Sequence, residues 1–483
     1  MTKELKRVSL VVAMMFISLF VSSSFIQGAG GQSYASDPRN VRSIYDSYKT
    51  LRGPILIDGK PIASSVESDD AYRYQRVYES SIYSAITGYF SVFRGATGIE
   101  SAMNSYLSGQ SSSQFFEQFN AVLSGNPVSG AAVELTIDPQ MQQAAWDALG
   151  DYRGSLVAID PLTGNILAMV SKPGYDANLI AGHDNSVVTT NYETLNNDAA
   201  KPLINKAISG DLYHPGSVFK LVVAAAALES GSYTNESAFS NPVSIQLPGS
   251  DAQVFNSSDR ACGSGGETVT LAEAMSFSCN VPFVELGLAL GQDRIRAQAE
   301  LFGFGRDLSI PMDVTPSTYP SGMDDAQLGL SSFGQFDVRV TPLQMAMVSA
   351  SVANGGVLMK PNLIETIISS NLSVIRAPKP EVLSQPMTSA TAESLRALMV
   401  QSVASGVASN AGVSGIEVAG KTGTAENGDG ARVTLWFTGF APAINPRVAI
   451  ALVIEDGGGR DSGASGNATA APVARDFFKA VIK

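Results

Sequence analysis

Apolar and polar positions divide the chain into a short N-terminal apolar segment and a long remainder with mixed patterns. Residues 8–27 carry no charge and are mostly apolar or small, whereas Lys3, Lys6 and Arg7 precede them. A helix of about 20 such residues spans a bilayer, and its positive flank stays in the cytoplasm. We therefore expect one transmembrane anchor at residues 8–27, a cytoplasmic tail at residues 1–7 and an extracytoplasmic remainder. A cleaved signal peptide is the alternative, but its apolar core would be shorter.

Beyond the anchor, composition separates two folded regions. Residues 28–36 are rich in Gly, Ser and Ala, as in a flexible spacer. Residues 37–150 mix polar helical stretches with short β-type runs and contain no catalytic constellation, which indicates a non-catalytic pedestal and linker. Residues 151–483 contain the long apolar segments of a large core and form the second expected domain. Two or more domains also suit a length of 483 residues.

The second domain is expected to contain an antiparallel sheet. Two β-type runs at residues 156–160 and 165–171 flank a Pro-Leu-Thr-Gly turn, which is typical of a hairpin. Further β-type runs lie near the C-terminus, separated by Gly, Asn and Pro turns, at residues 417–424, 432–441 and 447–455. Short connections of this kind predict an antiparallel meander.

Helices are expected on both faces of this sheet, because residues 448–454 are continuously apolar, as in a strand buried on both sides. Helical stretches at residues 390–403 and 470–482 can cover those faces. An all-helical subdomain is expected as an insertion at about residues 173–354. The predicted fold class is therefore α/β (α+β), with an antiparallel sheet sandwiched by helices and a cleft between sheet and insertion.

The most informative helix begins at Pro215 and Gly216 and runs without a polar face to Glu229. Such a helix is buried, so its first turn carries the polar groups that it presents to a cleft, Ser217 and Lys220. They lie at i and i+3, one turn apart on one face. A buried amine loses its proton readily and can then activate a serine hydroxyl as a nucleophile. The alternative is an N-cap serine followed by a lysine that extends to solvent.

Two further motifs add polar groups at defined positions. Ser278-Cys279-Asn280 lies between helices expected at residues 271–277 and 283–290. Lys421-Thr422-Gly423-Thr424 ends a short apolar strand, where the glycine lets a substrate backbone approach and the threonine hydroxyls can bind a carboxylate. Taken singly, the first motif is typical of an ordinary interhelical loop and the second of an ordinary strand.

In this order, SxxK, SxN and KTG resemble the motifs of the penicillin-recognising serine acyl transferases. The segments GSLVAIDPLTGNILAMVS from Gly154, TPLQMA from Thr341 and WFTGFAP from Trp436 are similar to the transpeptidase domain of class B penicillin-binding proteins. The whole chain resembles the penicillin-binding protein A group of actinobacteria, including DPRN from Asp37.

The resemblance implies a serine-type D,D-transpeptidase that cross-links peptidoglycan stem peptides ending in D-Ala-D-Ala, in cell growth or division. The implied partners are these stem peptides as donor and as amine acceptor, membrane-bound proteins of cell-wall synthesis, and β-lactams, which would acylate the enzyme and leave slowly. The region before residue 151 is too short for the glycosyltransferase domain of class A proteins. The chain should therefore cross-link glycan strands but not polymerise them.

The resemblance also implies roles for the motif residues. Ser217 would attack the penultimate carbonyl, and Lys220 would accept its proton. Ser278 would return the proton to the departing D-Ala, while Asn280 would hold Lys220 and the acyl amide. Backbone N–H groups of Ser217 and Thr424 would form the oxyanion hole. The terminal carboxylate would be bound by Lys421, Thr422, Gly423 and Thr424.

Three alternatives remain open at this point. A D,D-carboxypeptidase uses the same motifs with water as acceptor. A non-catalytic divisome scaffold or β-lactam sensor would not need an intact Ser217 and Lys220. A serine β-lactamase would need a carboxylate that activates the deacylating water, and the nearest look-alike, residues 193–196 (ETLN), precedes Ser217 and is interpreted as a loop.

Charge and composition exclude several other classes. The net charge of −12 disfavours nucleic acid and anionic membranes as partners. Two histidines and two cysteines offer no metal-binding spacing, so neither a metal site nor a cofactor is expected. Scarce histidine also argues against a Ser-His-Asp triad, and His214, three residues before Ser217, is interpreted as a loop histidine.

The two cysteines, Cys262 and Cys279, are expected to form a disulfide. Disulfides persist outside the cytoplasm, and the cysteine number is even. A bridge over 17 residues would stabilise the fold by about 3 kcal/mol and fix the loop of the SxN motif. The alternative is two separate thiols, with Cys279 buried as a small apolar residue.

Overall fold

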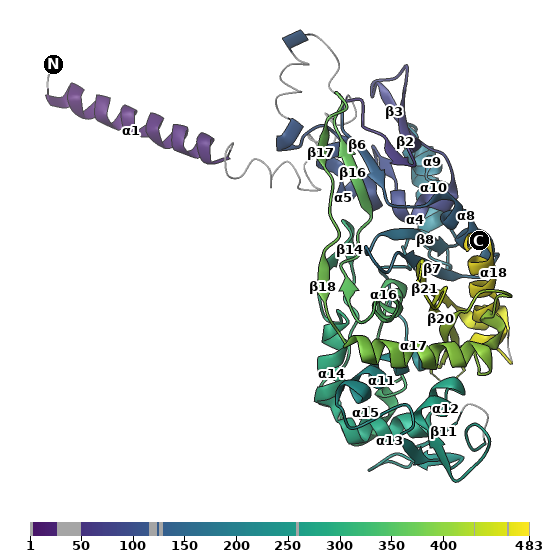
Figure 1. Cartoon of the computed structure of the whole chain (residues 1–483). Coiled ribbons are helices and arrows are strands. Elements are labelled where there is room, and N and C mark those ends of the chain that lie inside the picture. Colours follow the sequence, from purple (N-terminus) through teal and green to yellow (C-terminus); the bar gives the residue numbers. More distant parts are fainter. Residues whose placement is uncertain are drawn as a thin grey trace.

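The structure, a computed structural model, describes residues 3–26, 50–114, 123–124, 129–256, 260–428, 430–460 and 463–482. Helix α1 (Lys3–Phe25) is the one helix within these residues that is long and apolar enough to cross a bilayer, with a mean hydropathy of 2.2 (Figure 1). It coincides with the segment expected to be an anchor. The expected spacer at residues 28–36 and the DPRN segment lie outside the described residues.

A five-stranded antiparallel sheet forms the centre of the C-terminal domain, in the order β19-β20-β21-β7-β8 (Figure 1). This arrangement confirms the predicted hairpin and the predicted C-terminal meander. Strand β21 lies in the middle and is buried along its whole length, whereas β19 is an edge strand. The five strands are β7 (Gly154–Ile159), β8 (Ile166–Lys172), β19 (Ala419–Ala425), β20 (Thr434–Ala441) and β21 (Val448–Ile454).

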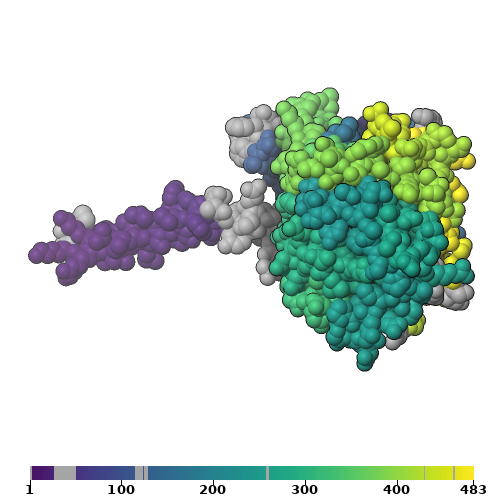
Figure 2. Space-filling view, turned by 60° about the horizontal axis from the view of Figure 1, so that its bottom comes forward, coloured from purple at the N-terminus to yellow at the C-terminus, as the bar shows by residue number. Residues whose placement is uncertain are grey.

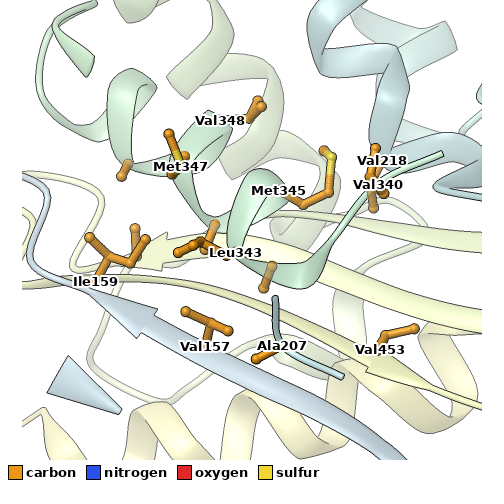
Figure 3. Close-up of a cluster of buried hydrophobic side chains, with 14 of the residues drawn as sticks. Val157, Ile159, Ala207, Val218, Val340, Leu343, Met345, Met347, Val348 and Val453 are labelled. Atoms are coloured by element: carbon orange, nitrogen blue, oxygen red, sulfur yellow. The ribbon is translucent and has the colours of Figure 1, made fainter. Parts of the chain in front are cut away.

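Alternate residues of these strands face two separate hydrophobic cores, because successive side chains of a strand point to opposite faces. Leu156 and Phe437 belong to the core under α8 (Pro139–Leu149) and α18 (Ala471–Val481). The opposite core is shown in Figure 3, where strand and helix side chains interdigitate; its labelled members are Val157, Ile159, Ala207, Val218, Val340, Leu343, Met345, Met347, Val348 and Val453.

Helix α16 (Pro342–Ala353) covers most of this second face, although it was expected to belong to the insertion. Eleven of its residues are buried, which suits a helix packed between the sheet and other helices. Helix α17 (Ser389–Ala404), which was predicted on the sheet, packs against β19. Helix α18 covers the first face as predicted.

The insertion is helical at its centre but not all-helical, so that part of the prediction is wrong. Residues rich in Gly, Ser, Asn and Pro turn the chain between short runs of Val, Phe and Thr, which pair as strands. The strand pairs are β9 (Ala238–Ser240) with β12 (Thr268–Thr270), β10 (Ser244–Gln246) with β11 (Gln253–Phe255), and β13 (Leu308–Ser309) with β14 (Asp313–Val314).

A second correction concerns residues 193–196, which were interpreted as a loop. They form the last turn of α10 (Asn185–Asn197), a polar helix whose N-cap, Asp184, accepts hydrogen bonds from the N–H groups of Ser186 and Val187. Only Val188 of this helix is buried, because its sequence lacks an apolar stripe.

Figure 2 looks onto the insertion, whose teal surface adjoins the green surface of later segments. Its helices are α11 (Lys220–Glu229), α12 (Leu271–Ser276), α13 (Val281–Leu290), α14 (Gln292–Leu301) and α15 (Asp325–Ser331). Helices α9 (Asn178–Ala181) and α10 lie apart from these, beside the N-terminal strand β3 (Tyr74–Tyr78) (Figure 1).

The N-terminal region contains a six-stranded sheet in the order β17-β16-β6-β1-β2-β3. Two of its strands, β16 (Ile364–Ile368) and β17 (Val374–Arg376), come from the C-terminal half of the chain. The other four are β1 (Ile55–Ile57), β2 (Lys60–Glu67), β3 (Tyr74–Tyr78) and β6 (Ala132–Leu135). Short elements complete the fold: α4 (Ser84–Thr87), β4 (Phe90–Ser91), β5 (Gly95–Ala96), α5 (Gly98–Ala102), α6 (Asn104–Leu107), β15 (Leu358–Met359) and β18 (Val382–Ser384).

Candidate active site

Ser217 lies in the short 3-10 turn Gly216–Phe219 that leads into α11. Gly216 has a positive φ of 53°, and a Cβ there would lie 2.8 Å from the carbonyl oxygen of Thr424, so only glycine fits. Its N–H donates to the carbonyl of Gly334 at 2.9 Å. The backbone of this turn therefore lies in direct contact with the backbone of β19. Within the described residues Ser217 Oγ has no hydrogen-bond partner, and it lines a cleft.

Lys220, one turn further, is fully buried. Its Nζ donates to the carbonyls of Ser278 and Cys279 at 2.8 and 2.9 Å and to Asn280 Oδ1 at 2.8 Å. Burial lowers the pKa of Lys220 well below its usual value, and the nearby charge of Lys421 lowers it further. The three oxygen acceptors favour the ammonium. A neutral amine donates only two protons, so deprotonation leaves one of these contacts unmade and frees a lone pair that can accept a proton.

Ser278 faces the second lysine. Its φ of 57° is unusual for a residue with a side chain, and it places the Ser278 hydroxyl toward β19 while its carbonyl faces Lys220. Lys421 Nζ donates to Ser278 Oγ at 2.7 Å and to the carbonyl of Thr422 at 3.0 Å. Burial lowers the pKa of Lys421 to about 7. Ser278 thus contacts both buried amines, one through each of its oxygens.

The two threonines of β19 differ in their hydrogen bonds. Thr422 is buried, and its hydroxyl donates to the carbonyl of Val407 at 3.0 Å. Thr424 is exposed to the cleft, and its hydroxyl accepts from the N–H of Gly466 at 3.1 Å. The Thr424 hydroxyl therefore keeps its own proton for a ligand, whereas the Thr422 hydroxyl does not. Gly423 packs beneath Pro215, since a Cβ there would lie 2.9 Å from the Pro215 carbonyl.

Cys262 and Cys279 form a disulfide, with their Cα atoms 5.8 Å apart. The bridge fixes the carbonyl of Cys279, which is one of the acceptors for Lys220. Asn280 is held on its other side, because its Nδ2 donates to the carbonyl of Phe255 at 2.9 Å. The SxN loop is therefore anchored covalently and by hydrogen bonds.

These motifs surround one cleft with a cavity volume of about 910 Å³. The two lysines lie behind its wall. His214, interpreted as a loop histidine, also lines the cleft; burial lowers its pKa, and its carbonyl accepts from Trp436 Nε1 at 2.9 Å. Lining residues that the sequence did not single out include Gln253, Phe255, Phe333, Gln335, Val407, Glu426 and Gly466. The sequence offered a signal for two of these residues, Phe333 and Gln335. They flank the isolated glycine Gly334, which could have indicated a close approach of the backbone.

Comparisons with known proteins agree with this geometry. The family model of the penicillin binding protein transpeptidase domain matches residues 154–479, and that of the penicillin binding protein A dimerisation domain matches residues 52–133. The chain is 40% identical to the peptidoglycan D,D-transpeptidase PbpA of Mycolicibacterium smegmatis, over 100% of this chain and 99% of the relative. The PbpA of Mycobacterium tuberculosis is 37% identical over the same shares.

Solved structures agree as well. Penicillin-binding protein A of M. tuberculosis, as a ceftriaxone acyl-enzyme complex, is similar with a TM-score of 0.87 and 36% identity, covering 91% of this chain and all of the other. The penicillin G acyl-enzyme complex of that protein gives a TM-score of 0.85 and covers 90% of this chain. With a transpeptidase model matching more than half of its length and a relative 40% identical along all of it, the chain belongs to the penicillin-binding protein transpeptidases, in the penicillin-binding protein A group.

Proposed function

We propose that the chain is a serine-type D,D-transpeptidase that cross-links peptidoglycan stem peptides through an acyl-enzyme on Ser217. The observation that carries the proposal is the buried amine of Lys220 one turn from a serine hydroxyl that is open to the cleft. Because its pKa is lowered by burial, Lys220 can be neutral at physiological pH and accept the serine proton.

Acylation begins when Ser217 Oγ attacks the penultimate carbonyl of a D-Ala-D-Ala donor. The C–O bond forms as the Oγ proton passes to Lys220, and backbone N–H groups of Ser217 and Thr424 stabilise the oxyanion. When the C–N bond breaks, the departing amine needs a proton. Ser278 Oγ donates it and is resupplied by Lys421, whose Nζ is 2.7 Å away.

The donor carboxylate binds at β19. Thr424 supplies a free hydroxyl proton, and Lys421 contributes positive charge from behind the strand while it is protonated. Asn280 keeps Lys220 in place through its Oδ1. Because β19 is an edge strand, a donor backbone can lie along it in an extended conformation.

In the second half of the reaction, an amine from a neighbouring stem attacks the ester carbon. The C–N bond of the cross-link forms and the ester C–O bond breaks as Lys220 returns its proton to Ser217 Oγ. The proton that the attacking amine loses passes through Ser278 Oγ to Lys421, so both lysines regain their starting protonation. β-Lactams imitate the donor and leave an ester that water attacks slowly.

The placement in the cell follows from α1. We propose that α1 anchors the chain with its N-terminus in the cytoplasm, that residues 37–150 form a non-catalytic pedestal, and that residues 151–483 catalyse cross-linking outside the membrane. The positive flank at Lys3, Lys6 and Arg7 supports this orientation. Other membrane-bound proteins of cell-wall synthesis are the expected partners.

Two assays with the detergent-solubilised full chain test the proposal. Fluorescent penicillin should label the protein covalently, and a Ser217→Ala variant should not be labelled. A stem pentapeptide with a free side-chain amine should then yield dimers and free D-Ala. Release of D-Ala without dimers would indicate a carboxypeptidase, and equal labelling of Ser217→Ala would refute the assignment of the nucleophile.

A further inference from the structure

Glu426 is the one acidic side chain among the described residues that line the cleft. It is exposed, and within the described part of the chain it forms no hydrogen bond or ion pair. The two lysines of the site are fully buried behind the wall and do not contact it. Among the lining side chains that the structure describes, this carboxylate is the acidic one and its acceptor oxygens are free, which favours a cationic group on the ligand at this end of the cleft.

Glu426 is the first residue after β19, and it continues the alternation of that strand into the cleft. Thr422, Thr424 and Glu426 occupy positions i, i+2 and i+4, and all three line the cleft. Each two-residue step along a strand is about 7 Å. The turn that carries Ser217 crosses β19 near Thr424, since a Cβ at Gly216 would lie 2.8 Å from its carbonyl. Glu426 therefore lies about 7 Å beyond the reacting centre, on the side opposite Thr422.

The proposed function orients the donor along this strand. Its terminal carboxylate lies between the Thr424 hydroxyl and the Lys421 end of β19, and its reacting carbonyl faces the backbone N–H groups of Ser217 and Thr424. The peptide that precedes the reacting carbonyl must then continue past Thr424 in the same direction. An extended peptide advances about 3.3 Å per residue, so the residue before D-Ala-D-Ala extends its side chain toward Glu426.

We propose that Glu426 binds the free side-chain amine of the donor residue that precedes D-Ala-D-Ala. This inference rests on the proposed function. Donor and acceptor are the same kind of stem peptide, and the acceptor supplies a side-chain amine to the cross-link. A donor that is not yet cross-linked carries that amine as a cation, whereas a donor already used as acceptor carries a neutral amide. Glu426 is thus a specificity residue that selects donors with a free amine.

The test compares two donors that differ by one acetyl group, which removes this charge: Nα-acetyl-L-Lys-D-Ala-D-lactate and its Nε-acetylated form. Acylation kcat/KM is measured for both with the full chain at low salt. The parent protein should prefer the free amine. Glu426→Gln should reduce that preference by about fivefold, the effect of an exposed ion pair worth about 1 kcal/mol, mainly through KM. Glu426→Asp should retain part of it.

The acetylated donor is the internal reference. A general loss of activity cancels in the ratio of kcat/KM for the free-amine donor to kcat/KM for the acetylated donor. Glu417→Gln, which removes an exposed carboxylate outside the cleft just before β19, should leave the ratio unchanged. An unchanged ratio in Glu426→Gln would overturn the inference, as would an effect seen only when the acceptor amine is varied. Failure of penicillin G to acylate the parent protein would instead refute the proposed function.

Discussion

Lys421 Nζ donates a 2.7 Å hydrogen bond to Ser278 Oγ, and this contact joins the edge strand β19 to the loop that holds Lys220. Both amines are buried, but the proposed function gives them opposite tasks. Lys220 must be neutral to accept a proton, whereas Lys421 must be protonated to attract a carboxylate and to supply Ser278. The pKa of Lys220 is lowered well below its usual value, and that of Lys421 to about 7.

Acylation by penicillin G should therefore lose rate as pH rises through about 7. Above this pH Lys421 is neutral and no longer attracts the β-lactam carboxylate. The rate should also fall at low pH, where Lys220 becomes protonated, so the profile should be bell-shaped. The second-order acylation rate, followed between about pH 6 and 9, provides the measurement. Penicillin G methyl ester, which lacks the carboxylate, is the control. It should react slowly and lose less rate above this pH, because only the proton supply to Ser278 then depends on Lys421.

Lys220→Arg should lower the acylation rate by about 10²- to 10⁴-fold, the usual contribution of a general base. Arginine stays protonated in proteins and cannot accept the serine proton. Its positive charge can still meet the carbonyl acceptors, so circular dichroism and the unfolding temperature should show a folded protein. A folded variant with the parent rate would remove Lys220 from the role of base.

Thr422→Val and Thr424→Val should have different effects, because the two hydroxyls have different partners. Thr422→Val leaves the Val407 carbonyl without its donor and should lower the free energy of unfolding by about 1 kcal/mol. Thr424→Val removes the hydroxyl proton available to a ligand and should raise KM for a carboxylate-bearing donor. Urea unfolding and donor kinetics of both variants test this pair. Equal effects on KM would contradict it.

Glu100 should be important for stability and not for acylation. Its carboxylate is fully buried and lies 2.6 Å from both Arg52 Nε and Arg76 Nε. Glu100→Gln leaves the two guanidinium groups without a counterion and should lower the free energy of unfolding by about 3–5 kcal/mol. Glu67→Gln, an exposed carboxylate on β2, is the matched control and should have no such effect. Penicillin G labelling of the folded variant should be normal.

The Glu100 carboxylate should also make the stability of the fold sensitive to acid. Burial alone would raise the pKa of Glu100, but the charges and hydrogen bonds of Arg76 and Arg52 outweigh it and lower the pKa. Its stabilisation is therefore present above about pH 4.3, the usual carboxyl pKa, and is lost as the pH falls through the lower folded value. Acid unfolding of the parent protein should be steeper than that of Glu100→Gln.

The sequence predicted the parts of the site that depend on local spacing. Ser217 and Lys220 share one helix face, and the KTG motif lies on one strand, so both could be assigned from nearby residues. The contact between Lys421 and Ser278 spans 143 residues and needed the fold. Position on a strand was not enough to distinguish Thr422 from Thr424. Their hydroxyls differ in hydrogen bonding, because one donates to the Val407 carbonyl and the other accepts from the Gly466 N–H. The resemblance placed all the motifs in one cleft, but Glu426 lay outside every motif.

Errors in the predicted fold have physical causes. Helix α10 has almost no apolar face, so its sequence resembles that of a loop. The short strands of the insertion are too brief to show alternation. The pairing of β16 with β6 joins residues that are far apart in the sequence, and neither strand carries a signal for its partner.

That pairing affects how far the two domains can be exchanged between relatives. Ile364 to Ile368 of β16 pair with Leu135 to Ala132 of β6, and β17 closes the far edge of the same sheet. A chimera that replaces only the residues before the transpeptidase domain would place foreign β1, β2, β3 and β6 against a native β16. A workable exchange would have to transfer residues 364–376 together with the N-terminal strands, because β16 and β17 of that sheet are encoded more than 200 residues downstream of β6.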